Sequence, residues 1–108
     1  MTLNIATNTL TTDSVRITFD PAKDANNKTK HGLSLEDARG LDWDAALVWE
    51  DRRREYGEAR YVALVPRQQH LFFVAFTERA DTTRIIGLRK ANLREIERYE
   101  AETDSTDA

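Results

Sequence analysis

The strongest hydrophobic pattern lies in the second half of the chain. Residues 71–76 form the most apolar run, and a polar segment, residues 77–83, separates it from a second run at residues 84–90. Both runs are short and rich in aromatic or β-branched residues, which is typical of antiparallel strands. We therefore predict a hairpin around a charged turn, with part of the core on one face and arginines at its ends.

Three further segments read as strands. Residues 60–65 predict a long strand leading into the hairpin, with Val62 and Leu64 on one face and Tyr61, Ala63 and Val65 on the other. Residues 15–19 alternate as a short half-buried strand does, and residues 46–49 read as a short strand or an extended lead-in.

Helix start and stop signals mark three helices. Asp20 and Pro21 suit the cap and first turn of a polar surface helix that ends at Gly32. Ser34 and Asp37 form a capping-box pattern that opens a second helix. A last helix starts near Asn92, with Glu95 completing a capping box, and we expect it to bury Leu93, Ile96 and Tyr99.

Together these elements predict an α+β fold. A small antiparallel sheet of three to four strands would pack with two N-terminal helices and a C-terminal helix, all segregated to one face. Residues 15–100 would form a single domain, between a flexible N-terminal tail (residues 1–14) and an acidic C-terminal tail (residues 101–108).

Composition narrows the class of protein. The 108 residues include no cysteine, and neither a signal peptide nor a membrane-spanning run is evident, so we expect a cytoplasmic protein. The formal net charge is −3, yet residues 52–100 hold eleven basic and seven acidic residues, a net charge of +4. Such a basic segment attracts phosphates, although a solvated charged surface is the plainer interpretation.

The candidate chemistry is that of phosphodiesters. No glycine-rich phosphate loop and no pair of histidines at metal-ligand spacing occurs, and we expect no metal and no cofactor. RNA cleavage needs no metal when the 2′-hydroxyl is the nucleophile, because Arg or Lys can stabilise the phosphorane and His or Glu can move protons. The candidates are His31 at a helix end, Glu58 and Arg60 on one strand face, Arg79 in the hairpin turn, and Arg84 and Arg89 at the two ends of the next strand.

Four of these candidates also have a structural interpretation. His31 could cap free carbonyls at the end of its helix. Glu58 and Arg60 could form only a surface ion pair, worth roughly 0–1 kcal/mol. Arg79 could simply be a polar turn residue.

In combination, these residues resemble the BrnT family of type II toxins, small ribonucleases with a RelE-like fold. The resemblance runs from about residue 17 to residue 99. It is carried by Phe19, Asp20, Pro21, Lys23, Asn27, Lys30, His31, Gly32, Ser34, Glu36, Ala38, Glu50, Asp51, Arg53, Tyr56, Gly57, Glu58, Arg60, Thr77, Glu78, Arg79, Arg84, Ile85, Ile86, Arg89, Lys90, Ala91, Arg94, Glu95 and Tyr99.

The resemblance implies a toxin that cleaves RNA and inhibits translation. It also implies neutralisation by a BrnA-like ribbon-helix-helix antitoxin, in a complex that represses its own operon and contacts operator DNA only through the antitoxin. We expect Arg79 and Arg84 to stabilise phosphate charge and Glu58 or His31 to carry the proton. We assign RNA binding to the basic residues Lys30, Arg60, Arg89 and Lys90.

Two positions depart from the family pattern. Gly87 stands where the family usually has Ser, and Phe19 stands where it usually has Trp. Loss of a hydroxyl at Gly87 keeps open a second hypothesis, an inactive toxin homologue that binds its antitoxin as a co-repressor. A third is a generic RNA-binding domain without turnover.

Overall fold

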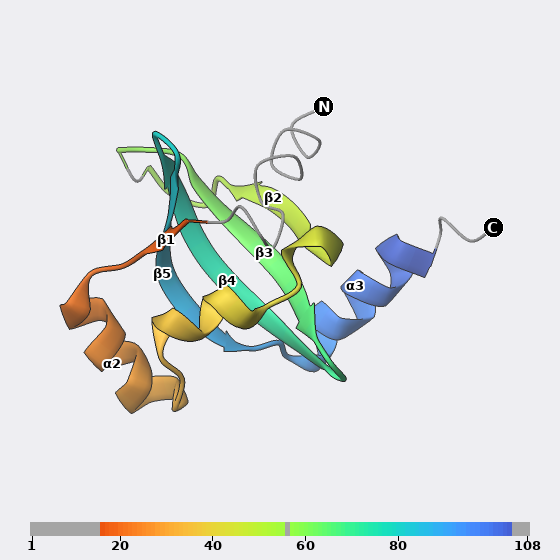
Figure 1. Ribbon diagram of the computed structural model, residues 1–108. Helices are drawn as coiled ribbons and strands as arrows, with labels where there is room; N and C mark the ends of the chain where they lie inside the picture. Colours follow the sequence, from red (N-terminus) through yellow and green to blue (C-terminus); the bar gives the residue numbers. More distant parts are fainter. Residues whose placement is uncertain (1–15, 56, 105–108) are drawn as a thin grey trace.

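The computed structural model describes residues 16–55 and 57–104 of the chain (Figure 1). The predicted N-terminal tail, residues 1–14, lies outside the described residues. The elements in chain order are β1 (Ile17–Thr18), α2 (Pro21–His31), the 3-10 helices η1 (Leu35–Gly40) and η2 (Trp43–Ala45), β2 (Leu47–Asp51), β3 (Arg60–Arg67), β4 (His70–Arg79), β5 (Thr82–Lys90) and α3 (Leu93–Asp104).

The described strands form one mixed sheet in the order β1-β5-β4-β3-β2. β1 runs parallel to β5, with Ile17 opposite Thr83, and the other neighbouring strands are antiparallel. The predicted α+β class is confirmed, but the sheet has five strands rather than three or four, and it is not wholly antiparallel. The short β1 was not predicted to pair with β5; the Thr83 N–H donates to the carbonyl of Arg16 at 2.7 Å, which anchors β1 on the free edge of that strand.

The central hairpin is longer than predicted. β4 continues to Arg79 and β5 starts at Thr82, so the turn consists of Ala80 and Asp81 alone. Ala80 has a φ of 52°, the left-handed conformation that many two-residue hairpin turns need. The prediction of a turn over residues 77–83 was therefore wrong, and Arg79 ends a strand. Polar composition misled the prediction, because these polar residues pair across the hairpin.

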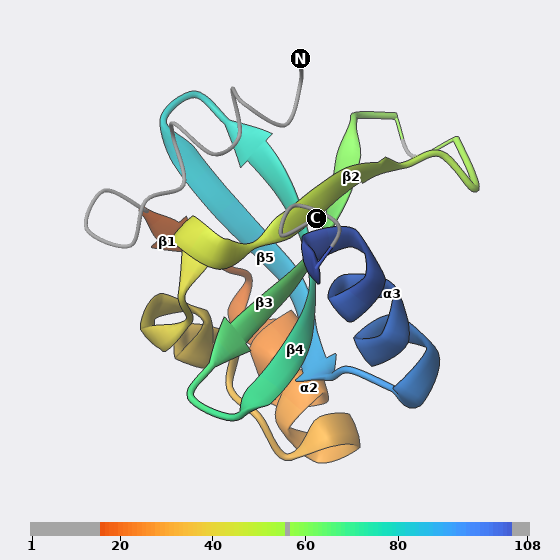
Figure 2. The same ribbon diagram turned by 90° about the vertical axis from the view of Figure 1, so that its right-hand side faces the viewer.

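Different helices cover the two faces of the sheet. η1 and η2 lie on the face that carries the main core, in which Trp43 meets the Phe76 ring edge-on. α3 lies on the other face (Figure 2). Its Arg98 lies over the Trp49 ring of β2. The predicted segregation of all helices to one face was thus wrong. The buried core cluster consists of Ile17, Leu35, Ala38, Leu41, Trp43, Ala63, Val65, Val74, Phe76, Ile85 and Leu88.

The predicted caps of the N-terminal helices are confirmed. The Asp20 side chain accepts from the backbone N–H of Ala22, and Gly32 ends α2 with a φ of 71°. Ser34 and Asp37 form a reciprocal capping box, although the helix they open is a 3-10 helix. Local hydrogen bonds from neighbouring residues decide these ends, so the sequence alone locates them.

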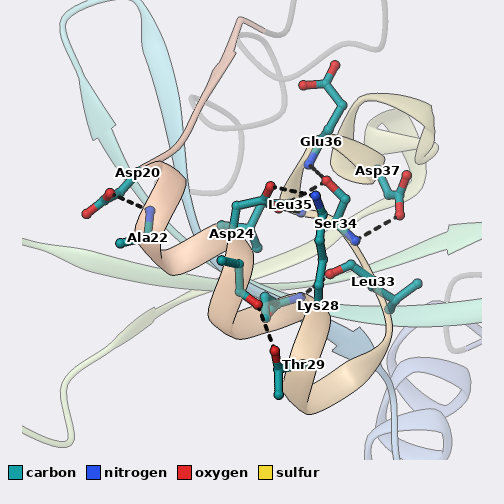
Figure 3. A network of polar contacts seen from close by, with 12 residues as sticks. Asp20, Ala22, Asp24, Lys28, Thr29, Leu33, Ser34, Leu35, Glu36 and Asp37 are labelled. Carbon is teal, nitrogen blue, oxygen red and sulfur yellow. Dashed lines mark hydrogen bonds and ion pairs between the residues drawn. The ribbon is translucent and has the colours of Figure 1, made fainter.

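Asp24 ties α2 to the start of η1 (Figure 3). Its carboxylate accepts from the Leu35 N–H at 2.7 Å and from the Ser34 hydroxyl at 3.0 Å, and Lys28 lies at 3.3 Å. The Leu35 hydrogen bond is the largest cause that lowers the pKa of Asp24 below its ordinary value. The ionised carboxylate therefore fixes the turn between the two helices.

Asn27, the buried residue of α2, closes an open stretch of the β5 edge. Its side-chain amide donates to the carbonyls of Leu88 and Leu33, at 2.9 and 2.8 Å, and its oxygen accepts from the Leu88 N–H at 3.1 Å. The side chain thus takes the place of a neighbouring strand. Without it, the free N–H and C=O groups of this edge could pair with a strand of another chain. This contact positions α2 beside the last part of β5.

The C-terminal helix begins as predicted but packs differently. Asn92 and Glu95 exchange side-chain hydrogen bonds with each other's backbone N–H groups, which confirms the predicted capping box. The prediction that Leu93 is buried was wrong, since it is 70% exposed. The partly buried residues of α3, among them Ile96 and Tyr99, recur at helical spacing on a stripe that Leu93 does not share.

Candidate functional site

The candidate site lies on the sheet face that carries α3, toward the β4–β5 turn. Arg84 of β5 is directly opposite Thr77 of β4. The pairing of Tyr61 with Phe76 brings Arg60, one residue earlier, opposite Thr77 on the other side. Side chains directly opposite each other in a sheet share a face, so Arg60, Thr77 and Arg84 form a row across three strands.

Glu58 and Arg79 form the ion pair beside this row. Arg79 donates from Nε to Glu58 Oε1 at 3.3 Å and from Nη2 to Oε2 at 3.0 Å, a bidentate arrangement. The Arg79 side chain is 53% exposed and the Glu58 side chain is 39% exposed, so both can contact a ligand. Glu58 precedes β3 in a loop, so the prediction that it shares a strand face with Arg60 was wrong, although the two charges are close enough to interact.

Three guanidinium groups act on the Glu58 carboxylate. The hydrogen bond from Arg79 is the largest cause that holds the pKa of Glu58 below its ordinary value of 4.5, and the charges of Arg79, Arg60 and Arg84 act in the same direction. Glu58 is therefore ionised at neutral pH. Asp51 lies opposite Arg60 in the β2–β3 pairing and Glu58 bonds to Arg79, so Arg84 is the cation of this cluster without an ion-pair carboxylate among the described residues, and such a cation attracts phosphate.

Arg84 differs from its neighbours because no carboxylate of the described residues lies within ion-pair distance of it. The side chain is half-buried on the row next to Thr77. The Thr77 hydroxyl is itself buried and finds no hydrogen-bond partner within the described part of the chain. Arg84 has no ion pair to give up, so it can bind an incoming anion at little cost in broken contacts.

A hollow of about 660 Å³ adjoins the ion pair, lined by the ends of β2 and β3 and the loop that joins them. In this loop the arginine run is partly neutralised. Arg53 donates two hydrogen bonds of 2.9 Å to the Asp51 carboxylate, and Arg52 donates to Glu50 at 3.0 Å. The hollow therefore offers room beside Glu58, while Arg52 and Arg53 on its wall already have acidic partners.

The structure does not bring Lys30 and His31 to this cluster. Both are exposed at the end of α2, whose Asn27 contacts Leu88 of β5. Leu88 lies four residues along the strand from Arg84, roughly 13 Å at the rise of an extended strand. His31 and Glu58 are thus placed on different parts of the molecule.

Arg89 and Lys90 lie at the opposite end of β5 from Arg84. Arg89 donates two hydrogen bonds of 2.9 Å to Glu95 of α3, and its guanidinium stacks 3.9 Å from the centroid of the Phe73 ring. Burial acts to raise the pKa of Glu95, but the hydrogen bonds from Arg89 and the Asn92 backbone prevail and lower it. Arg89 is therefore held in the contact between α3 and the sheet.

Sequence reasoning missed several residues near the site. Thr77 was assigned to the turn, although the alternation of Phe73, Ala75, Thr77 and Arg79 along one strand face could have revealed it. Arg94 entered only the family resemblance and Arg98 was not named, so neither of these arginines, four residues apart on α3, was predicted as a site residue. Their helical spacing is a usable signal, because it puts both guanidinium groups on one side of the helix.

Within residues 16–55 and 57–104, no group of three or more His, Cys, Asp or Glu side chains is arranged to hold a metal ion. No helix in that part of the chain is long and apolar enough to cross a membrane.

Comparison with protein families gives a match over most of the chain. The model of the ribonuclease toxin BrnT, of type II toxin–antitoxin systems, matches residues 19–95. The matched segment runs from the residue before the α2 cap to Glu95 at the start of α3, and it includes Glu58, Arg79 and Arg84. It confirms the family resemblance read from the sequence. No curated protein matches the chain.

Proposed function

Because the chain belongs to the BrnT family, the ribonuclease toxins of type II toxin–antitoxin systems, we propose that it is an endoribonuclease whose reaction centre is the Glu58–Arg79–Arg84 cluster. The observation that carries this proposal is the arrangement of three guanidinium groups around one ionised carboxylate on an accessible sheet face. Such a cluster suits an RNA phosphodiester, which is anionic in the ground state and gains charge in the transition state.

In the proposed reaction, the RNA 2′-oxygen attacks the adjacent phosphorus. A new P–O2′ bond forms, the P–O5′ bond breaks, and the 2′-hydroxyl proton goes to Glu58 while the leaving 5′-oxygen takes a proton from water. The products are a 2′,3′-cyclic phosphate and a 5′-hydroxyl end. Arg84 and Arg79 stabilise the crowded anionic phosphorane, and no metal is required by this route.

The Glu58–Arg79 ion pair gives Glu58 two states. Without substrate, the Arg79 hydrogen bond keeps the pKa of Glu58 low, which makes it a weak base. A phosphate that binds Arg79 competes with the carboxylate for the same guanidinium. Release of that hydrogen bond raises the pKa of Glu58 and improves it as a proton acceptor just when the 2′-hydroxyl is in place.

We assign the proton transfer to Glu58 rather than His31 for geometric reasons. A proton carrier must reach the reacting atoms directly or through one water molecule. Glu58 bonds to Arg79, whereas His31 ends α2, beside the other end of β5. Arg60 then holds the RNA backbone next to the reaction centre, and Lys30, Arg89 and Lys90 would act on more distant phosphates.

We further propose a cytoplasmic toxin that inhibits translation by cutting RNA. A type II system implies a protein antitoxin. We expect a BrnA-like ribbon-helix-helix protein, which would neutralise the toxin and carry the operator DNA contacts of the complex.

A second candidate function is antitoxin-dependent co-repression without catalysis. It is favoured by Gly87, which lies opposite Ala75 in the sheet and offers no hydroxyl to the site. Co-purification with the antitoxin, without RNA cleavage by the isolated protein, would support it.

Induced expression tests the proposal in cells. Wild type should arrest growth and degrade cellular RNA, whereas an Arg79→Ala, Arg84→Ala double variant should do neither. The matched control is the Lys23→Ala, Arg67→Ala double variant. It also removes two positive charges, one from α2 and one from the far end of β3, and it should remain toxic. Equal toxicity of the Arg79→Ala, Arg84→Ala variant would reject the site, and harmless wild type would reject the activity.

A further inference from the structure

A second hollow lies on the same sheet face, between α3 and β2. Its volume is about 340 Å³, near the lower end of the range for small-molecule sites. Trp49, Val62 and Phe73 supply apolar surface, and Arg94 and Arg98 of α3 line it as well. The residues 50–53 line both this groove and the larger hollow beside Glu58, so the two adjoin.

The acidic side chains of this groove are all paired, but not all of its arginines are. Its three acids each have an arginine partner: Glu50 bonds to Arg52, Asp51 to Arg53 and Glu95 to Arg89, at 2.9–3.0 Å. That leaves two further arginines on its helical wall.

Arg94 has no carboxylate within ion-pair distance among the described residues. Arg98 meets Glu102 at 3.3 Å, in a pair that is about half exposed. An exposed pair of this kind exchanges readily for another anion.

Stacked guanidinium groups are the second feature of the groove. Arg98 lies 3.9 Å from the centroid of the Trp49 ring, and Arg89 lies 3.9 Å from that of Phe73. A guanidinium that lies over an aromatic ring forms a platform on which an unpaired base can stack. Arg94, four residues before Arg98, projects from the same side of α3 and is suited to the phosphate of that nucleotide.

We propose that this groove is a nucleotide subsite, in which one base of the RNA strand stacks on the Arg98–Trp49 pair and a flanking phosphate binds Arg94. Its place next to the cleavage position rests on the proposed function of the Glu58 cluster. The volume fits one nucleotide rather than a duplex. An acidic peptide could satisfy the charges, but it carries no base to use the stacked guanidinium, so the observations favour a single-stranded nucleic acid.

Tryptophan fluorescence gives a direct test. The chain has two tryptophans: Trp43 is 1% exposed in the core, and Trp49 lies in the groove. The probe is a fully 2′-O-methylated tetranucleotide, which cannot be cut by 2′-oxygen attack, and a second probe has the same phosphates but abasic positions. The base-containing probe should quench wild-type fluorescence saturably, and a Trp49→Phe variant should lose that signal.

Three variants separate the parts of the subsite. Arg94→Ala should weaken binding of both probes by about 5-fold or more, as expected for a lost charge-assisted phosphate contact. Arg98→Lys retains the charge but not the plane, so it should weaken binding of the base-containing probe about 5-fold or more and leave the abasic probe unchanged. Lys23→Ala on α2 is the control and should bind like wild type.

Several results would overturn the inference. Equal binding of the two probes, with no effect of Arg98→Lys, would mean that the groove binds phosphate only. Quenching by an octaglutamate peptide but not by the oligonucleotide would identify a protein-binding groove instead. RNA cleavage by wild type without any change at Trp49 would reject the subsite alone, whereas the predicted quenching without RNA cleavage would support the subsite and reject the proposed activity.

Discussion

Arg84 and Arg89 lie on the same strand and on the same face of the sheet, yet their surroundings differ completely. Arg89 is 31% exposed, bonds to Glu95 through two contacts and stacks on Phe73. Arg84 is half-buried near the other end of β5, with no ion-pair partner in the described part of the chain. One arginine fastens α3 to the sheet, and the other is available to an anion.

The cover provided by α3 creates this difference. The helix lies at the Arg89 end of this sheet face (Figure 2), and it brings Glu95 to Arg89. The other half, toward the β4–β5 turn, holds Glu58 as the carboxylate near Arg84. A basic strand read from sequence therefore contains two kinds of arginine, and only the acidic partners distinguish them.

The largest expected effect is on catalysis at Arg84. Arg84→Ala should lower kcat about 100-fold or more, because it removes a cation aimed at the developing phosphorane charge. The free energy of unfolding should change by less than about 0.5 kcal/mol, since no ion pair is lost. Cleavage kinetics on an RNA oligonucleotide and urea unfolding measure the two quantities. A large loss of stability in Arg84→Ala would mean that Arg84, like Arg89, is held in a structural contact.

Arg89→Ala should have the opposite effect, a large loss of stability and a small change in kcat. Loss of the paired and stacked guanidinium should lower the free energy of unfolding by about 1–2 kcal/mol, while kcat changes only a few-fold. Urea unfolding below neutral pH provides a second check. The folded-state pKa of Glu95 lies below 4.5, so the stability it contributes is present above that value and is lost as the pH falls through the lowered pKa. Arg89→Ala should lose less stability than wild type over that acid range.

The pH dependence of cleavage should reveal the two states of Glu58. Its pKa lies below 4.5 while Arg79 is bound to it, so the acid limb of kcat/KM, which reports the free enzyme, should lie below pH 4.5. In the complex, phosphate takes Arg79, and the acid limb of kcat should move to higher pH. If the acid limbs of kcat/KM and kcat lie at the same pH, Glu58 does not have two states. If Glu58→Gln shows the same acid limbs as wild type, Glu58 is not the proton acceptor.

The smallest expected effect comes from Gly87→Ser. A Cβ at this position would meet only Asn27 Oδ1, at 4.0 Å, which is an ordinary van der Waals contact. Replacement of a strand glycine should add up to about 0.5–1 kcal/mol of stability. If the missing hydroxyl limits the site, kcat should rise several-fold. An unchanged kcat would mean that Arg79 and Arg84 suffice without it.

The sequence predicted those features that neighbouring residues determine. The caps at Asp20, Ser34 and Asn92 follow from side-chain hydrogen bonds within three residues, and the continuous apolar run of residues 61–65 follows from burial on both faces of β3. Arg60, Arg79, Arg84 and Glu58 were all named as candidates from their chemistry alone.

What failed depends on contacts between distant segments. The parallel pairing of β1 with β5 and the placement of α3 on the second face are set by how the sheet packs, which no local pattern records. The same holds for Leu93, which has an apolar side chain but no surface to cover it. His31 looked equivalent to Glu58 because residue chemistry carries no information about which end of β5 each one adjoins.

Analysis of RNA product ends tests the central claim most directly. Purified wild type, incubated with an RNA oligonucleotide in the presence of a metal chelator, should produce 2′,3′-cyclic phosphate and 5′-hydroxyl ends, and a 2′-deoxy substitution at the cut position should abolish cleavage there. Arg84→Ala should yield almost no product. Products with 3′-hydroxyl and 5′-phosphate ends, or full cleavage by Arg84→Ala, would contradict the account.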